Sequence, residues 1–144
     1  MTKYFEAKIK YRKTNEQGVQ KVVTEAYLLD AISYSEAERR ITEEVSANIT
    51  GDFKVANIRV TNYSEVHSSD EADSWFKSKV SLIAFDDESG KEKKTNIYLL
   101  VQANDVKDAN ERTIEVMKGT MGDYTIPAIS ETSIVDFFPY FSGE

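Results

Sequence analysis

The first residues of the chain alternate between apolar and polar side chains. The apolar positions are Phe5, Ala7, Ile9 and Tyr11, and the charged positions between and after them are Glu6, Lys8, Lys10 and Arg12. A period of two is typical of a β-strand that buries one face. A polar turn around Gly18 follows, and a second stretch rich in Val, Tyr and Leu returns over residues 19–29. The pattern predicts a β-hairpin.

The spacing of apolar residues changes after residue 32. Ser33 and Glu36 have the S-x-x-E form of a capping box, which marks the start of a helix. The apolar stripe that follows consists of Ala37, Ile41, Val45 and Ile49. A third strand is then predicted from Phe53 to about Val66. The first half of the chain is therefore expected to form a ββαβ unit.

The same order of elements returns in the second half. Residues 4–9 match residues 75–80, and residues 27–29 match residues 98–100, both at an offset of 71 positions. Asp105 and Asp108 stand where the first copy has its helix cap. We interpret the chain as an internal duplication, with a first ββαβ repeat over residues 1–66, an acidic linker over 67–74 and a second repeat over 75–144.

The expected fold class is α+β, with two helices packed on antiparallel sheet and pseudo-twofold symmetry between the repeats. Each repeat alone offers only three strands and one helix, which is a small core for an independent domain. We therefore expect the two repeats to pack together into one compact domain.

Composition narrows the cellular setting. The 144 residues include no cysteine, so disulfides, thiolate metal sites and cysteine nucleophiles are excluded. No apolar run approaches the length of a membrane span, and the first residues lack the apolar core of a secretory signal. The sequence predicts a cytoplasmic protein without a membrane partner.

No motif for catalysis or for a cofactor stands out. His67 lies in the predicted linker without the neighbours of a zinc site, and Asp86–Gly90 lacks the spacing of a calcium loop. Phosphate-binding glycine loops and nucleophile elbows are also missing from the sequence. We expect a protein that is not an enzyme and that needs no metal or cofactor.

The predicted strand faces opposite the helices carry the candidate binding residues. Although the net charge of the chain is −7, residues 3–24 hold six Lys or Arg against two Glu. Aromatic rings among cations can stack on bases while the cations hold phosphates. The candidate residues are Tyr4, Lys8, Lys10, Arg12 and Tyr27 of the first repeat, with Trp75, Lys77, Lys79, Lys94 and Tyr98 of the second.

The same faces have two other interpretations. They could pack on a protein partner or on a second copy of the chain, with lysine stems covering apolar surface. They could also be plain solvated faces of antiparallel sheet. The leading hypothesis is a non-catalytic binding or assembly module that acts through protein contacts, with a homodimer as one form. The alternative is the binding of single-stranded nucleic acid or a nucleotide.

Four segments add a resemblance that covers nearly the whole chain. They are Trp75–Val80, Gly90–Thr95, Tyr98–Ala103 and Met117–Met121. These segments resemble a family of uncharacterised proteins from Bacteroides-type bacteria and their phages, classed as a domain of unknown function. The resemblance implies a bacterial or phage cytosolic setting and carries over no catalytic residue. It adds a third hypothesis, a phage anti-defence protein that sequesters a host protein or a nucleotide signal.

Overall fold

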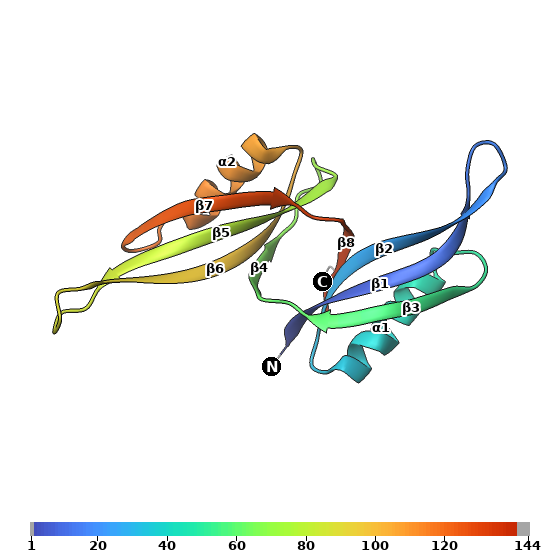
Figure 1. Ribbon diagram of the computed structural model, residues 1–144, viewed down its shortest axis with the longest axis horizontal. Helices are drawn as coiled ribbons and strands as arrows, with labels where there is room; N and C mark the ends of the chain where they lie inside the picture. The colour runs from blue at the N-terminus through green and yellow to red at the C-terminus, as the bar shows by residue number, and fades with distance from the viewer. Residues whose placement is uncertain (1, 141–144) are drawn as a thin grey trace. The chain divides into compact units, whose positions relative to one another are not determined.

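A computed structural model describes residues 2–140 of the chain, and the elements in it are eight strands and two helices (Figure 1). Residues 141–144, the last four of the predicted second repeat, lie outside the described residues. The elements in chain order are β1 (Lys3–Thr14), β2 (Gln20–Ala31), α1 (Tyr34–Ser46), β3 (Phe53–Val60), β4 (Tyr63–His67), β5 (Ser74–Phe85), β6 (Glu92–Ala103), α2 (Val106–Met117), β7 (Asp123–Glu131) and β8 (Ile134–Phe138).

The chain divides into two compact units with the same architecture. Unit 1 comprises Met1–Thr61 with Ser133–Glu144, and unit 2 comprises Asn62–Thr132. The strand order is β3-β1-β2-β8 in unit 1 and β4-β6-β5-β7 in unit 2. Each unit adds one helix to its sheet, so the α+β class and the duplication are confirmed. Three strands of each sheet are antiparallel, whereas the fourth, β8 on β2 or β4 on β6, is parallel.

The fourth strand of each unit comes from the other repeat. The sequence predicted one long third strand per repeat, but the structure breaks it after residue 60 and after residue 131. Strand β4 therefore joins the sheet of unit 2, and β8 joins the sheet of unit 1. The units thus differ from the predicted repeats 1–66 and 75–144, and His67 ends a strand that belongs to unit 2.

A threonine stands at each of these breaks. The backbone N–H and the hydroxyl of Thr61 both donate to the backbone oxygen of Tyr4, at 2.8 and 2.9 Å. Thr132 makes the same two bonds to the backbone oxygen of Trp75, both at 2.9 Å. Each threonine fastens the end of β3 or β7 to the start of the neighbouring strand, just before the chain passes into the other unit.

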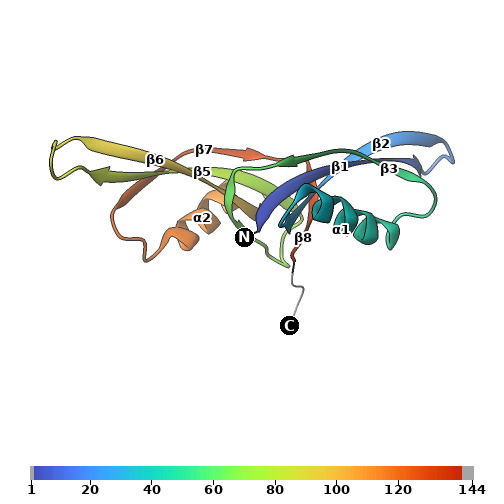
Figure 2. The ribbon, with the colours of Figure 1, turned by 90° about the horizontal axis from the view of Figure 1, so that it is seen from below.

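The register of the first hairpin determines the core of unit 1. Strands β1 and β2 are joined over twelve residue pairs, with Phe5 opposite Leu29 and Ala7 opposite Tyr27. Figure 2 shows the helix of each unit on one face of its own sheet. The buried residues between sheet and helix in unit 1 are Phe5, Ala7, Ile9, Leu29, Ala31, Ala37, Ile41 and Val45. Burying a large side chain of this kind contributes about 1.5–3 kcal/mol.

The second hairpin pairs in a different register from the one that sequence matching indicated. Ala7 lies opposite Tyr27, but its counterpart Ser78 lies opposite Leu99. The second turn is one residue longer, so Tyr98 corresponds to Ala26 and not to Tyr27. The predicted match of residues 27–29 with residues 98–100 is therefore wrong by one position, and the true offset in this strand is 72.

Both helices begin as the sequence predicted. The backbone N–H of Glu36 donates to the Ser33 hydroxyl, and that of Asp108 donates to the carboxylate of Asp105. The Asp108 carboxylate in turn accepts the backbone N–H of Asn104 at 2.9 Å, and this bond is the main cause that lowers its pKa. Within residues 2–140, neither helix has the length and apolar character needed to cross a membrane.

Arg40 connects α1 to the exchanged strand β8. Its guanidinium donates to the backbone oxygens of Asp30, Phe138 and Pro139, and stacks over the ring of Tyr140 at 4.9 Å. The counterpart in unit 2, Arg112, instead bonds to Asp108 four residues earlier on its own helix. We infer that Arg40 holds the end of β8 in place.

Replacing Arg40 by alanine should lower the free energy of unfolding by about 2 kcal/mol, because charge-assisted bonds to three backbone carbonyl groups and an ion pair with Asp30 are lost. Chemical denaturation followed by circular dichroism measures this change. The matched variant Arg112→Ala should cost under about 1 kcal/mol, since it removes an ion pair within one helix. Equal losses in the two variants would contradict the tethering role of Arg40.

Candidate binding surface

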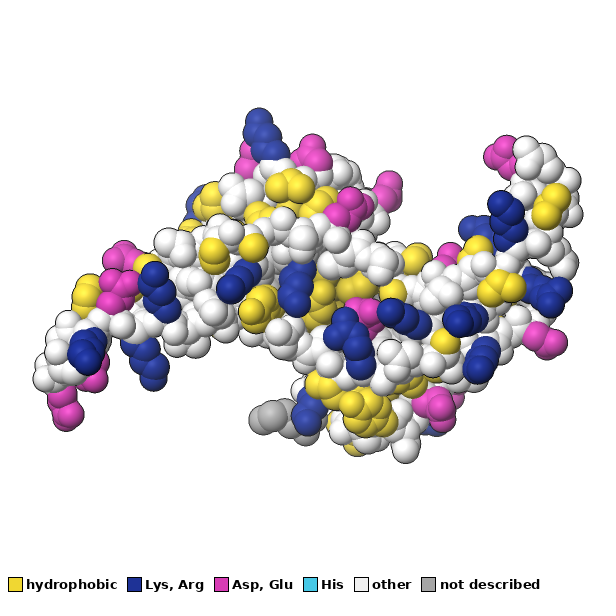
Figure 3. Space-filling view, in the orientation of Figure 1, with side chains coloured by type: hydrophobic (Ala, Val, Ile, Leu, Met, Phe, Trp, Pro, Cys, Tyr) yellow, Lys and Arg dark blue, Asp and Glu magenta, His cyan; other side chains and the backbone are white. Residues whose placement is uncertain are grey.

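Besides Arg59, which is bound to Glu6, four cations lie on the face of the unit 1 sheet that α1 leaves uncovered. Lys8, Lys10 and Arg12 alternate along β1 with residues of the core face, and Lys54 of β3 is directly opposite Lys10. All four side chains belong to exposed residues. Figure 3 shows Lys and Arg side chains following one another across this face, over β1 and β3. We call Lys8, Lys10, Arg12 and Lys54 the cationic row.

The cationic row lacks acidic partners. Glu6 shares its face of β1, but its carboxylate is bound by Arg59 at 2.9 Å and the residue is only 8% exposed. The β2 residues directly opposite Lys8, Lys10 and Arg12 are the uncharged Ala26, Thr24 and Val22. In the part of the chain that the structure describes, none of the four cations forms a salt bridge.

Such an arrangement costs stability in the free protein. Like charges directly opposite each other on neighbouring strands repel, as Lys10 and Lys54 do here. An anion placed between them would relieve the repulsion. The row also borders a depression of about 610 Å³ at the hairpin end of the sheet. Its lining includes Lys10, Tyr11, Arg12, Asp52, Phe53 and Lys54.

Sequence reasoning placed Lys8, Lys10 and Arg12 on this face but missed Lys54. The signal that could have found Lys54 is the alternation in the third strand. Phe53 and Val55 are the apolar neighbours of Lys54, and both pack against the core of unit 1. The same period-two argument that was applied to β1 would have placed Lys54 on the opposite face, beside Lys10.

The sheet of unit 2 keeps one cation of the row. The positions that correspond to Lys8, Lys10, Arg12 and Lys54 are occupied by Lys79, Ser81, Ile83 and Thr125. The pairing itself is preserved, because Ser81 lies opposite Thr125 just as Lys10 lies opposite Lys54. The cationic row is therefore a property of unit 1 and not of the repeat.

The other candidate cations of unit 2 have partners within that unit. The ammonium group of Lys77 lies over the rings of Tyr98 and Tyr63, at 4.7 and 5.5 Å from their centroids. Lys94 is 3.8 Å from the carboxylate of Glu92. Tyr98 and Lys79 are directly opposite each other, so these candidates do share the uncovered face. The charges of Lys77 and Lys94 are partly compensated, unlike those of the cationic row.

The candidate aromatic residues do not form a stacking platform. Trp75 is only 2% exposed, so its ring is closed to a ligand. Tyr4 is half-buried, with its ring 6.0 Å from that of Phe137. The face of the Tyr98 ring contacts Lys77. Cations and open aromatic rings are thus not interleaved on either sheet in the way that the sequence suggested.

Tyr27 lies on the opposite face from the one predicted. It is paired with Ala7 of the core face, packs against the core of unit 1 and stacks on Phe138 with ring centroids 5.4 Å apart. The error has the same origin as the mismatch between the hairpins. Counting residues cannot show how a turn sets the register of the returning strand, and a shift of one residue moves a side chain to the other face.

The hydroxyl of Tyr27 belongs to a small network on the core face. Tyr27 and Tyr11 both donate to the same carboxylate oxygen of Glu25, at 2.9 and 3.0 Å. Burial first, and then the hydrogen bond to Glu25 and its negative charge, raise the pKa of both tyrosines above the ordinary value of 10.0. Both hydroxyls therefore keep their protons in the folded protein at a pH where free tyrosine would lose them.

This network predicts a loss of stability in alkali. Because the folded pKa of Tyr27 is raised, its contribution is complete below about pH 10 and is lost as the pH rises above that value. The free energy of unfolding, measured by urea titration at a series of alkaline pH values, should therefore fall more steeply with pH in the native protein than in Tyr27→Phe. Parallel curves for the two proteins would contradict this expectation.

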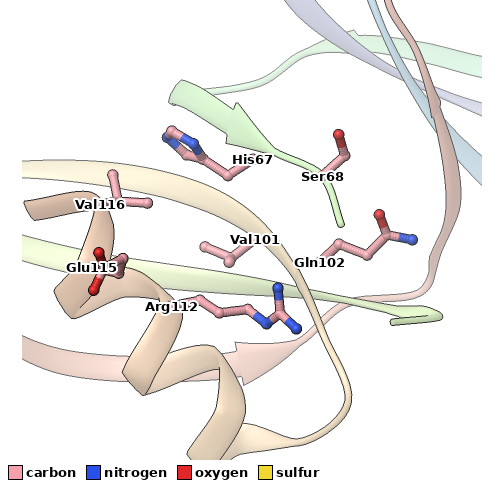
Figure 4. A pocket seen from close by; sticks show the side chains of 7 residues that line it. All are labelled: His67, Ser68, Val101, Gln102, Arg112, Glu115 and Val116. Atoms are coloured by element: carbon pink, nitrogen blue, oxygen red, sulfur yellow. The ribbon is translucent and has the colours of Figure 1, made fainter. Parts of the chain in front are cut away.

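Unit 2 contains a separate small pocket of about 200 Å³ between α2 and the sheet. Figure 4 shows His67 and Ser68 at the end of β4, Val101 and Gln102 on β6, and Arg112, Glu115 and Val116 on α2. His67 contacts the Glu65 carboxylate at 2.8 Å, and Arg112 contacts Asp108. The Gln102 side chain binds the backbone of Ser69 and Ala72, which fastens the loop before β5. The polar side chains of His67, Gln102 and Arg112 are thus already engaged in contacts within unit 2, and we do not interpret the pocket as a binding site.

The residues that the structure describes contain no candidate metal site. Within residues 2–140, no group of three or more His, Asp or Glu side chains is arranged to hold a metal ion. The cationic row is the candidate binding feature that the described residues offer.

The fold is that of a duplicated α+β protein, and in this chain one of the two units carries a cationic sheet face. The chain belongs to the family described as a domain of unknown function (DUF4494), whose model matches residues 3–140. No curated protein and no solved structure matches the chain significantly.

Proposed function

We propose that this protein is a non-catalytic binding module that acts through protein contacts, and that its cationic row binds an acidic segment of a protein partner. The observation that carries the proposal is that none of Lys8, Lys10, Arg12 and Lys54 forms a salt bridge in the described part of the chain, although Asp52 lines the depression beside three of them. A chain with a net charge of −7 that keeps four neighbouring cations unpaired has a surface suited to a negatively charged ligand.

A protein ligand is favoured over single-stranded nucleic acid because of the aromatic side chains. Proteins that bind single strands combine cations with exposed rings on which the bases stack. Here Trp75 is buried, Tyr27 lies on the core face and Tyr4 packs on Phe137. Binding of a nucleic acid or a nucleotide by phosphate contacts alone remains the second candidate, and the cationic row itself supports it.

The proposed setting is the cytoplasm of a Bacteroides-type bacterium or of such a cell infected by phage. In that setting an acidic partner could be a host protein that the module sequesters, which is the anti-defence form of the proposal. A homodimer remains compatible with the proposal if the two copies leave the cationic row free.

The first test measures binding of labelled poly-L-glutamate and of labelled oligo(dT) and oligo(U), by fluorescence anisotropy at low and at physiological salt. Poly-L-glutamate should bind more tightly than either oligonucleotide. The variant Lys10→Gln/Lys54→Gln should weaken this binding roughly tenfold, since two ion pairs are worth about 1.4 kcal/mol together. The affinity should also fall as salt is added.

The matched control is Lys79→Gln/Lys94→Gln on the sheet of unit 2. It makes the same substitutions and the same change in net charge, but it leaves the cationic row intact. It should bind poly-L-glutamate like the native protein. Equal weakening by both variants would mean that total charge and not the row governs binding. Tighter binding of the oligonucleotides, lost in Lys10→Gln/Lys54→Gln, would favour the nucleic-acid candidate.

A further inference from the structure

Strand β3 is an edge strand that runs beside the cationic row. It pairs with β1 on one side, and no strand of residues 2–140 pairs with its other side. An edge of this kind presents unpaired backbone N–H and C=O groups, and it can accept a further strand from another chain. The opposite edge of the same sheet already accepts β8, a strand of only five residues.

The equivalent edge of unit 2 carries a proline, whereas β3 does not. Strand β7 carries Pro127, and a proline on an edge strand prevents further pairing. Ala56 occupies the corresponding position of β3. It lies at a bulge, where the pairing with β1 passes from Val55 to Asn57 and leaves Ala56 without a partner residue. The unit with the cationic row is thus the unit whose edge strand lacks a proline.

The two faces of β3 specify what an added strand should carry. On the uncovered face, the charged residues are Lys54 and Arg59. On the core face, Phe53, Val55 and Ile58 are half-buried, and Val60 is still 38% exposed. A strand added beside β3 alternates between these faces. Acidic side chains would then face Lys54 and the cationic row, and apolar side chains would extend the core.

A second copy of this chain fits the edge poorly. In the antiparallel register that sets Lys54 of one copy opposite Arg59 of the other, two cations would be paired across the new strand boundary, and like charges on paired strands repel. The charge of the edge therefore favours a different chain with acidic residues.

We propose that β3 binds its partner by strand addition, and that the partner supplies an extended segment in which acidic and apolar residues alternate. The inference rests on the proposed function, because it names the form of the acidic partner that the cationic row binds. It adds a requirement on the conformation and residue order of the partner. Main-chain pairing needs an extended segment with the correct alternation, whereas attraction by charge alone does not.

The test compares two synthetic peptides of identical composition. One alternates glutamate with valine, and the other has all its glutamates in one block and all its valines in a second block. The alternating peptide should bind at least about tenfold more tightly, because only it can satisfy both faces of β3. Hydrogen exchange should slow in the β3 amides when the alternating peptide is bound.

The variant Ala56→Pro tests the edge itself. Proline is already accommodated at the matching position 127, and Ala56 has no partner residue in β1, so the fold should be retained. Circular dichroism and the denaturation midpoint check this directly. The variant should lose the preference for the alternating peptide but keep its affinity for poly-L-glutamate. The control Pro127→Ala, which alters the edge of unit 2, should leave both affinities unchanged or add a second, weaker site.

The outcomes separate the two proposals. Equal binding of the two peptides, with no effect of Ala56→Pro and no slowing of exchange in β3, would overturn strand addition and leave the acidic-partner function in place. Failure of poly-L-glutamate and of both peptides to bind at low salt would overturn the acidic-partner function and strand addition together.

Discussion

The pairing of β1 with β2 determines most of what unit 1 presents to its surroundings. Twelve residue pairs in one register place Phe5, Ala7 and Ile9 under α1, and the same alternation leaves Lys8, Lys10 and Arg12 on the other face. A slip of one residue would bring charged side chains into the core and apolar ones into water. The register of this hairpin therefore determines both the core and the cationic surface, and a change of register would alter both.

The two units show how copies of one fold can diverge without losing it. At one place between helix and sheet, unit 1 has Ala7 and Ile41, whereas unit 2 has Ser78 and Thr113. The two hydroxyls of unit 2 are buried and hydrogen-bond each other at 2.7 Å, so the polar pair is satisfied. The uncovered faces have diverged further, because residues there need only be compatible with a strand. This freedom lets the two units present different surfaces on the same fold.

Sequence patterns predicted the local structure well, because it depends on neighbours in the chain. Alternation placed β1 and three cations of the row, and short capping motifs marked both helices. The break between β3 and β4 was not predictable in this way, since residues 53–66 contain no Gly or Pro that would interrupt a strand. The burial of Trp75 and the face of Tyr27 depend on strand order and hairpin register, which are tertiary properties.

The exchange of β4 and β8 bears on the origin of the chain. A protein with only one repeat would have a sheet of three strands, without the fourth strand that the other repeat supplies. Its last strand, the equivalent of β4 or β8, would have no second sheet to join. Two such proteins could satisfy each other by exchanging these strands, as domain-swapped dimers do. Fusion of two copies would then turn an association that depends on concentration into a single covalent molecule. A chain with two repeats therefore contains within one polypeptide the strand pairing that two single-repeat chains would have to form together.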